Sequence, residues 1–200
     1  DPDNSQNVDS PNGKLLRLTP DGDVPDDNPR PGNPLFLWGI RNTEGWDWPA
    51  PANAEDVWLT DHGPSGEMLR TGHDEVNVAS ANDNLGWPTI YKCRSEEGMS
   101  VPVLTWNDAV PPGGAAVYTG DAIPEWKGSF IIGTLGSRHL HRAVIEKGSV
   151  TAHEVYFQNE LGRLREVIMG PDGHLYVTTS NCDGRGSCPP ERDKILRIVK

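Results

Sequence analysis

Two similar stretches lie near opposite ends of the chain: GKLLRLTPDGDVP at residues 13–25 and DKILRIVK at residues 193–200. The first contains Gly-Lys-Leu-Leu-Arg-Leu, and the second contains Asp-Lys-Ile-Leu-Arg-Ile. Repetition of this kind favours a fold built from repeated units. We therefore interpret the two stretches as equivalent strands of a repeat architecture. The alternative is a chance similarity between two strands with basic residues.

Short β-branched or aromatic runs bounded by turn residues recur along the sequence, while helical periodicity is almost missing. The tight-turn tripeptide Pro-Asp-Gly occurs twice, at 20–22 and 171–173. Many short strands at regular spacing are typical of an all-β sandwich, barrel or propeller. The expected strands cover 15–19, 35–40, 57–60, 115–120, 129–135, 139–145, 152–157, 166–170, 175–180 and 195–199.

The C-terminal repeat favours a propeller among these three folds. GPDGHLYVTTSN at 170–181, a Gly-rich loop and then DKILRI give a hairpin, a loop and a further strand, as in a propeller blade. Near the N-terminus, GKLLRL has the position of DKILRI, but no counterpart of PDGHLYVTTS precedes it. We therefore expect residues 1–200 to form one partial β-propeller domain that begins inside a blade, with its N-terminal blades missing.

The composition limits the classes of partner. The formal net charge is −11 at pH 7, which argues against nucleic acid because nucleic-acid binding rewards basic surfaces. No run approaches the roughly 18 apolar residues of a membrane span. The acidity is compatible with binding of cations, Ca²⁺ in particular, although solubility alone explains it equally simply.

The three cysteines are Cys93, Cys182 and Cys188. None forms a C-x-x-C pair, so we expect no zinc or dithiol redox site. Cys182 and Cys188 share the Gly-rich stretch NCDGRGSC. A small disulfide in an exported protein and a pair of free thiols both remain open for them.

Two arginine-containing stretches suggest an anionic ligand. Arg41 and Asn42 follow an apolar run in WGIRNTEG, and an Arg fork beside an amide suits a carboxylate or quinone edge. Arg163 and Arg165 lie two apart on an expected strand and therefore share one face. Two guanidinium groups on one face need an anion between them. The alternatives are a surface charge for Arg41 and, for the pair, structural salt bridges, for which the candidate partners are Glu160 and Glu166.

The stretch TDHGPSGEMLRTGHDEVN at 60–77 suggests a calcium site. Gly63 and Pro64 form a turn whose carbonyl groups can face a hard cation, and Ca²⁺ takes carbonyl and carboxylate oxygens together. The irregular spacing makes this a moderate signal, and we interpret the two histidines of the stretch as structural. The nearby carboxylates belong to Asp61, Glu67, Asp74 and Glu75.

Taken together, these motifs resemble the glucose/sorbosone dehydrogenase family, the soluble PQQ-dependent aldose sugar dehydrogenases. The resemblance runs nearly end to end and in the same order. It implies a six-bladed β-propeller in the full-length protein, of which this chain covers about the last three to four blades. It also implies the cofactor pyrroloquinoline quinone (PQQ) together with Ca²⁺. The matching stretches are GKLLRLTPDGDVPDDNP, WGIRNTEG, TDHGPSG, HDEVN, NLGWP, PPGGAAVYTGDAIPEWKGSFIIGTL, GRLREVIMGPDGHLYVTTSN and DKILRI.

The resemblance also assigns roles to individual residues. It implies that the cofactor is bound by Arg41, Asn42, Arg163 and Arg165. It implies that the carbonyls of Gly63 and Pro64 bind the active-site Ca²⁺, and that Glu75, preceded by Asp74, serves a second, structural Ca²⁺ together with the main chain at Leu85.

The chain departs from the family pattern in three places. The segment that carries the family's catalytic histidine has no match here, so we assign no catalytic residue. Gly136 stands where some members have a cofactor-contacting lysine, and the Asn107–Asp108 region replaces a threonine. The first departure leads us to expect that this chain is a fragment of a family member. The other two replace residues that some members have, and so bear on how tightly the cofactor is bound.

The resemblance implies oxidation of an aldose sugar at C1 to a lactone, with electrons passed to an acceptor that the sequence does not identify. We expect a periplasmic or extracellular location. We also expect an N-terminal segment or an associated chain to cover the open strand edges. A non-catalytic propeller that binds a protein or carbohydrate is the alternative, and a Ca²⁺-dependent lactone hydrolase is a third interpretation.

Overall fold

The structure, a computed structural model, describes residues 1–49, 56–92 and 94–200. This part contains thirteen β-strands and three short 3₁₀ helices but no α-helix. The 3₁₀ helices are η1 (Pro2–Ser5), η2 (Glu67–Leu69) and η3 (Pro124–Trp126). The predicted all-β class is therefore confirmed. No helix in the described ranges is long and apolar enough to cross a bilayer.

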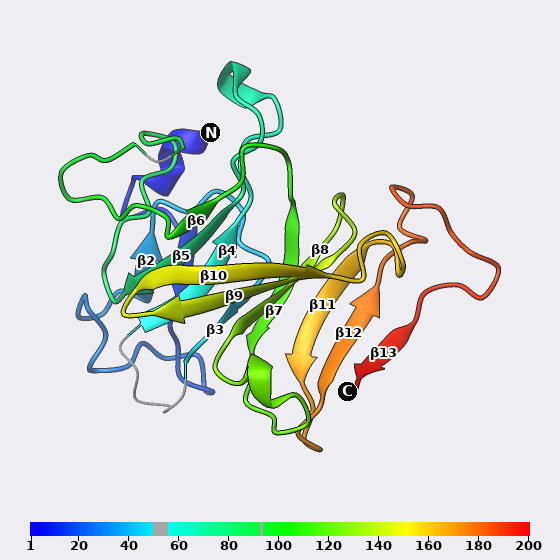
Figure 1. The fold of residues 1–200 in the computed structure, drawn as a ribbon. Helices are drawn as coiled ribbons and strands as arrows, with labels where there is room; N and C mark the ends of the chain where they lie inside the picture. Colours follow the sequence, from blue (N-terminus) through cyan, green and yellow to red (C-terminus); the bar gives the residue numbers. More distant parts are fainter. Residues whose placement is uncertain (50–55, 93) are drawn as a thin grey trace.

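The strands form four antiparallel sheets, and within each sheet the strands follow one another in chain order. Figure 1 shows these sheets succeeding one another from the blue N-terminal region to the red C-terminal strand. The sheets are β1 (Lys14–Leu16) with β2 (Leu35–Trp38); β3 (Trp46–Asp47), β4 (Asp56–Asp61), β5 (Glu75–Ser80) and β6 (Leu104–Thr105); β7 (Pro112–Val117), β8 (Phe130–Thr134), β9 (Leu140–Glu146) and β10 (Ser149–Tyr156); and β11 (Leu164–Met169), β12 (Leu175–Thr179) and β13 (Ile195–Ile198).

Each sheet packs face to face on the next, and a separate apolar cluster fills each interface. One cluster joins the β1–β2 sheet to the β3–β6 sheet and contains Leu37 and Leu59. The next joins β3–β6 to β7–β10, and the third joins β7–β10 to β11–β13. Sequential meander sheets with a core between every neighbouring pair are the arrangement of propeller blades.

Strand β8 shows how the sequence specifies this arrangement. Its residues Phe130, Ile131 and Ile132 are all fully buried. Because side chains alternate across a strand, Phe130 and Ile132 enter the cluster against β3–β6, while Ile131 enters the cluster against β11–β13. A continuous apolar run therefore marks a strand that is covered on both faces.

A buried histidine lies in the interface between the β3–β6 and β7–β10 sheets. His141 is 1% exposed, and its ring packs edge-on against Trp106 with the ring centres 5.0 Å apart. Its Nδ1 lies 3.3 Å from Nε2 of His139, and its ring stacks on His153. Burial, and then its two histidine neighbours, lower the pKa of His141 to about 3, so this side chain is neutral in the folded protein.

The innermost strands approach one another at backbone distance. A Cβ atom on Gly45, next to β3, would lie 2.6 Å from the carbonyl oxygen of Gly113 in β7. A Cβ atom on Gly113 would in turn lie 2.5 Å from the carbonyl oxygen of Arg165 in β11. Only glycine fits at these two positions, because any side chain would push neighbouring sheets apart.

The expected strands are found, but the sequence did not predict β3 and β5. Strand β5 reads Glu-Val-Asn-Val-Ala-Ser, and its polar residues hid it among the neighbouring turn residues. The repeat at the two ends is a repeat of strands: GKLLRL contains β1, and DKILRI contains β13, the third strand of its sheet. In the described part of the chain, β1 pairs only with β2, and β13 pairs only with β12.

Candidate functional site

The sheets open into a cleft of about 880 Å³ at one end of the strands. In an antiparallel meander, the start of the first strand, the end of the second and the start of the third lie at the same end. The loops before β3, β7 and β11 and the loops after β4, β8 and β12 therefore gather there. Residues far apart in sequence line this one cleft, among them Arg41, Asn42, Gly63, Pro64, Asp74, Arg163 and Arg165.

Arg163 and Arg165 share one carboxylate on the β11–β13 side of the cleft. The Nη2 atoms of Arg163 and Arg165 lie 3.0 Å and 3.4 Å from the same Oδ2 of Asp183. Arg165 also donates through Nη1 to Glu44, at 2.6 Å. The sequence predicted both arginines on one strand, but β11 begins at Leu164, so Arg163 lies just before the strand; the two guanidinium groups nevertheless reach the same carboxylate oxygen. Among the described residues the acidic partners are Asp183 and Glu44, and neither Glu160 nor Glu166 pairs with these arginines.

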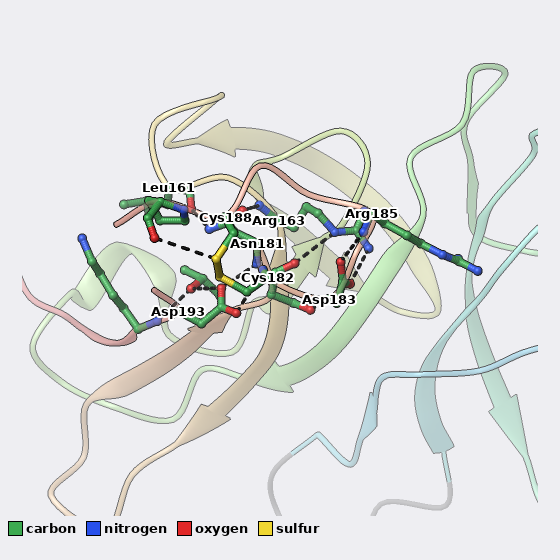
Figure 2. Close-up of a disulfide and its surroundings, with 12 residues drawn as sticks. Leu161, Arg163, Asn181, Cys182, Asp183, Arg185, Cys188 and Asp193 are labelled. Atoms are coloured by element: carbon green, nitrogen blue, oxygen red, sulfur yellow. Dashed lines mark hydrogen bonds and ion pairs between the residues drawn. A yellow bond between two sulfur atoms is a disulfide. The ribbon is translucent and has the colours of Figure 1, made fainter. Parts of the chain in front are cut away.

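Asp183 lies in a loop that a disulfide closes. Cys182 and Cys188 form this disulfide, which answers the question that the sequence left open, whereas Cys93 lies outside the described residues. Figure 2 shows the disulfide beside Asn181, with Asp183 and Arg185 on the side of the loop toward Arg163. The loop follows β12 and so lies at the cleft end of its sheet.

Arg41 and Asn42 are held by the end of β4. The carboxylate of Asp61 accepts the backbone N–H of Arg41 at 2.9 Å and that of Asn42 at 2.6 Å. The Arg41 guanidinium pairs with Glu67, donates to the carbonyl oxygen of His62, and lies 5.7 Å from the ring centre of Trp87. These contacts place a planar cation and an amide together on the cleft wall.

The turn at Gly63 and Pro64 is fixed by the start of β5. Asp74 accepts the N–H of Gly63 through Oδ1 at 3.0 Å and that of Val110 through Oδ2 at 2.7 Å. A Cβ atom on Gly63 would lie 1.9 Å from the carbonyl oxygen of Gly72, so no larger residue fits this turn. Asp74 therefore links the turn to the loop before β7.

A second, small cavity of about 20 Å³ adjoins the turn. A cavity of this size holds roughly one water molecule or ion. Asp61 and Glu75 both line it, and no lysine lines it. Burial raises the pKa of Asp61 to about 6, and burial followed by the charge of Asp61 raises the pKa of Glu75 to about 8. The other lining residues are Arg41, His62, Gly63, Pro64, Leu85, Trp87, Ile90 and Tyr91.

This donor set fits Ca²⁺. Two carboxylates in a confined space repel each other as anions, and a divalent cation relieves that repulsion. Within the described ranges, no three His, Cys, Asp or Glu side chains gather as a metal cluster. The carbonyl groups of Gly63 and Pro64 were predicted for the active-site Ca²⁺, and Glu75 with the main chain at Leu85 for a second Ca²⁺; all four residues line this one small cavity, whereas Asp74 does not.

The cleft itself fits a planar anion such as PQQ. Three arginines come from the β11–β13 sheet: Arg163, Arg165 and Arg185. Arg163 and Arg165 pair with the carboxylates Asp183 and Glu44, and Arg185 makes no ion pair with a described carboxylate, so positive charge is in excess there. The anion predicted between Arg163 and Arg165 is, within the protein, the carboxylate of Asp183. The cleft that both arginines line leaves room for a further anion as a ligand.

The sequence reasoning did not identify four residues that contribute to the cleft. Glu44 and Trp87 line it, and so does Arg185, while Asp183 binds two of its arginines. The sequence signal for the last two was the stretch Asp-Gly-Arg-Gly between the two cysteines. Gly136 is exposed and does not line the cleft, whereas its neighbour Leu135 does.

Fold and site together define a β-propeller whose cleft combines an arginine cluster with a confined carboxylate site. The sequence profile of the family described as Glucose / Sorbosone dehydrogenase matches residues 1–197. The chain belongs to this family, and the predicted resemblance is confirmed.

Relatives with known names support the same assignment. The aldose sugar dehydrogenase YliI of Escherichia coli (strain K12) is 33% identical over 198 residues, which cover 90% of this chain and 51% of that protein. The PQQ-bound aldose sugar dehydrogenase of Streptomyces coelicolor superposes with a TM-score of 0.85 at 32% identity, covering 100% of this chain and 55% of that one. An oxidoreductase of Thermus thermophilus, described as a glucose dehydrogenase, gives a TM-score of 0.88 at 36% identity, with coverage of 100% and 59%. The chain thus spans about half the length of these relatives.

Proposed function

We propose that this chain forms the cofactor- and calcium-binding part of a PQQ-dependent aldose sugar dehydrogenase that acts in the periplasm or outside the cell. The reaction would oxidise the sugar at C1 to a lactone and pass the electrons to an external acceptor. One observation carries the proposal: residues separated by more than 120 positions, from Arg41 to Arg165, line a single cleft. The S. coelicolor relative described as PQQ-bound supports the choice of cofactor.

The residues of this chain would bind and orient the reactants. Arg163 and Arg165 would hold carboxylates of PQQ, and Arg41 with Asn42 would contact its quinone edge. The Asp61 carboxylate fixes the backbone of Arg41 and Asn42 and thereby the direction of their side chains. Gly63 and Pro64 would bind Ca²⁺ through their carbonyls, in a turn that Asp74 holds in place. Bound PQQ would supply the quinone that accepts a hydride from the sugar.

No residue of this chain is assigned as the catalytic base. A base must lie within hydrogen-bond reach of the C1 hydroxyl, and the histidine segment of the family has no match in this sequence. His62 lines the cleft, but its Nε2 lies 2.5 Å from the carbonyl oxygen of Pro112, so this nitrogen donates to the main chain. We therefore expect cofactor uptake by this chain and little turnover.

The test separates uptake from turnover. PQQ and Ca²⁺ are added to this chain and to the full-length gene product, and PQQ binding is followed by tryptophan fluorescence. Aldose-dependent reduction of an artificial electron acceptor is then measured. We expect both proteins to bind PQQ and only the full-length product to turn over. Absence of PQQ uptake by both proteins would contradict the proposal and favour a non-catalytic binding module.

A further inference from the structure

We propose that the loop closed by the Cys182–Cys188 disulfide sets the geometry of the anion-binding end of the cleft. In this proposal Asp183 is a positioning residue for Arg163 and Arg165, and Arg185 is an additional contact for the anion. The identity of the anion as PQQ rests on the proposed function. The loop itself is referred to below as the disulfide loop, residues 182–188.

Asp183 binds both arginines and also accepts hydrogen bonds from neighbouring residues of its own segment. Its Oδ2 accepts from Arg163, from Arg165 and from the hydroxyl of Ser180 at 3.0 Å, and its Oδ1 accepts the backbone N–H of Arg185 at 2.9 Å. The Arg185 N–H, followed by Ser180 and Arg163, holds the pKa of Asp183 well below its usual range. The carboxylate therefore stays charged, and its hydrogen bonds orient it toward the two arginines.

The disulfide loop is anchored on the side away from the cleft. Asp193 accepts the backbone N–H of Asn181 at 2.5 Å and that of Cys182 at 3.1 Å. Asn181 in turn accepts the backbone N–H of Arg163 at 2.9 Å through its side chain. Together with the disulfide, these contacts fix both ends of the segment that carries Asp183, so the carboxylate is presented to the arginines from a rigid support.

The three arginines differ in their exposure. The side chain of Arg163 is 9% exposed, and its Nε also donates to the carbonyl oxygen of Ser180 at 3.1 Å. The side chain of Arg165 is 39% exposed toward the cleft. Arg185 is exposed, lines the cleft, and makes no ion pair with any described carboxylate. Arg163 is thus the most firmly held of the three, while Arg165 and Arg185 have more of their donors open to an incoming anion.

The loop also controls the space around Arg163. A Cβ atom on Gly186 would lie 2.6 Å from the carbonyl oxygen of Asn181 and 2.9 Å from Cδ of Arg163. The loop backbone therefore packs directly on the arginine side chain. Opening the disulfide would release this packing and the Asp183 contact together, so we expect the affinity for the anion to depend on the intact disulfide.

The experiment measures the dissociation constant of PQQ in the presence of Ca²⁺ by tryptophan fluorescence, for this chain and for four variants. Hydrogen bonds to charged groups contribute about 1.5–3 kcal/mol, so Asp183→Asn and the double variant Cys182→Ser/Cys188→Ser should weaken binding by about tenfold or more. Arg185→Gln should weaken binding by about threefold to tenfold and reduce its dependence on salt concentration. Asp183→Glu should restore part of the affinity.

The matched control is Asp172→Asn in the same sheet. Asp172 also pairs with an arginine, since its Oδ2 lies 3.4 Å from Nε of Arg197, but it lies in the turn at the opposite end of β11 and β12. This variant should bind PQQ as the unchanged chain does. Thermal melts of all variants show whether each one folds, and Arg185→Gln removes a side chain without an ion pair in the described ranges, so it should keep the fold.

The outcomes separate this inference from the proposed function. If the unchanged chain binds no PQQ, the proposed function fails and this inference fails with it. If the unchanged chain binds PQQ and the Asp183, Arg185 and cysteine variants bind it equally well, only this inference is overturned. A loss of affinity in these variants, with normal binding by the Asp172 variant, supports the positioning role.

Discussion

Two regions at the cleft end of the sheets, called here the arginine wall and the carboxylate wall, differ in their charged groups, although both are built from the ends of antiparallel strands. The arginine wall consists of Arg163, Arg165 and Arg185 from the β11–β13 sheet. The carboxylate wall consists of Asp74 in the cleft and of Asp61 and Glu75 in the small cavity that adjoins it, all at the cleft end of the β3–β6 sheet. On the first wall each charge meets an opposite charge or open solvent. On the second wall the pKa of Asp61 and that of Glu75 are both raised by burial.

The difference indicates what each wall lacks. The arginine wall is already organised by Asp183 and Glu44 and accepts a further anion without rebuilding. The carboxylate wall holds two acidic groups around a cavity of about 20 Å³, where a cation would remove a repulsion. We therefore expect the first wall to depend mainly on its own salt bridges and the second to depend on added metal.

The largest expected effect concerns the two central arginines. Arg163→Met should lower the free energy of unfolding by up to about 3 kcal/mol, because it removes a buried guanidinium and leaves the carbonyl oxygen of Ser180 without its donor. Arg165→Met should lower it by less than about 1 kcal/mol, because its guanidinium is 39% exposed and screened by solvent. Urea denaturation followed by fluorescence measures both values. Equal losses of unfolding free energy in the two variants would contradict the view that Arg163 contributes more to stability than Arg165 does.

An intermediate effect is expected on the carboxylate wall. Ca²⁺ at about 100 times its dissociation constant should raise the free energy of unfolding by about 2.7 kcal/mol, and a chelator should reverse this gain. Glu75→Gln should lose most of the calcium-dependent gain. Glu146→Gln, on an exposed strand end, is the matched control and should keep it. Thermal melts with Ca²⁺ and with chelator test this, and an undiminished gain in the Glu75 variant would remove Glu75 from the site.

The smallest expected effect on stability concerns His141, which is buried between the β3–β6 and β7–β10 sheets. His141 has a folded-state pKa of about 3, below the usual value near 6.5, so the unfolded chain binds more protons between these values. Its contribution to stability is therefore complete above pH 6.5 and falls as the pH drops toward 3, by at most about 1.4 kcal/mol per pH unit. Urea denaturation at pH 7 and pH 5 should show a smaller loss in His141→Gln than in the unchanged chain. Equal losses would mean that His141 takes up its proton without unfolding.

Much of the fold was predictable because it depends on local patterns. The apolar run at 129–135 and the Pro-Asp-Gly turns indicated strands and turns directly. Strand β5 escaped prediction although Val76 and Val78 alternate with Glu75 and Asn77, because the run is short and follows a stretch rich in turn residues; its pairing with β4, where Asn77 lies opposite Leu59, defines it in the structure. Such pairing is invisible in a single segment.

The candidate site was predictable in part. The period-2 rule put Arg163 and Arg165 on one face, and the need for an anion between them followed from charge alone. The identity of the nearest anion did not follow, because Asp183 lies 18 residues beyond Arg165 and reaches it only through the disulfide loop. Glu44 is further still, at 121 residues from Arg165. Contacts between blades depend on how successive sheets pack on one another, which no local pattern contains.

The close approach at Gly45 and Gly113 has a consequence for the width of the cleft. These two positions determine how far the β3, β7 and β11 strands stand from one another, and each allows only a hydrogen atom between backbones. The separation of the arginine wall from the carboxylate wall is therefore determined by residues that touch neither ligand site. A single methyl group at either position would act as a spacer, and it would alter the fit of any rigid planar molecule that has to reach both walls at once.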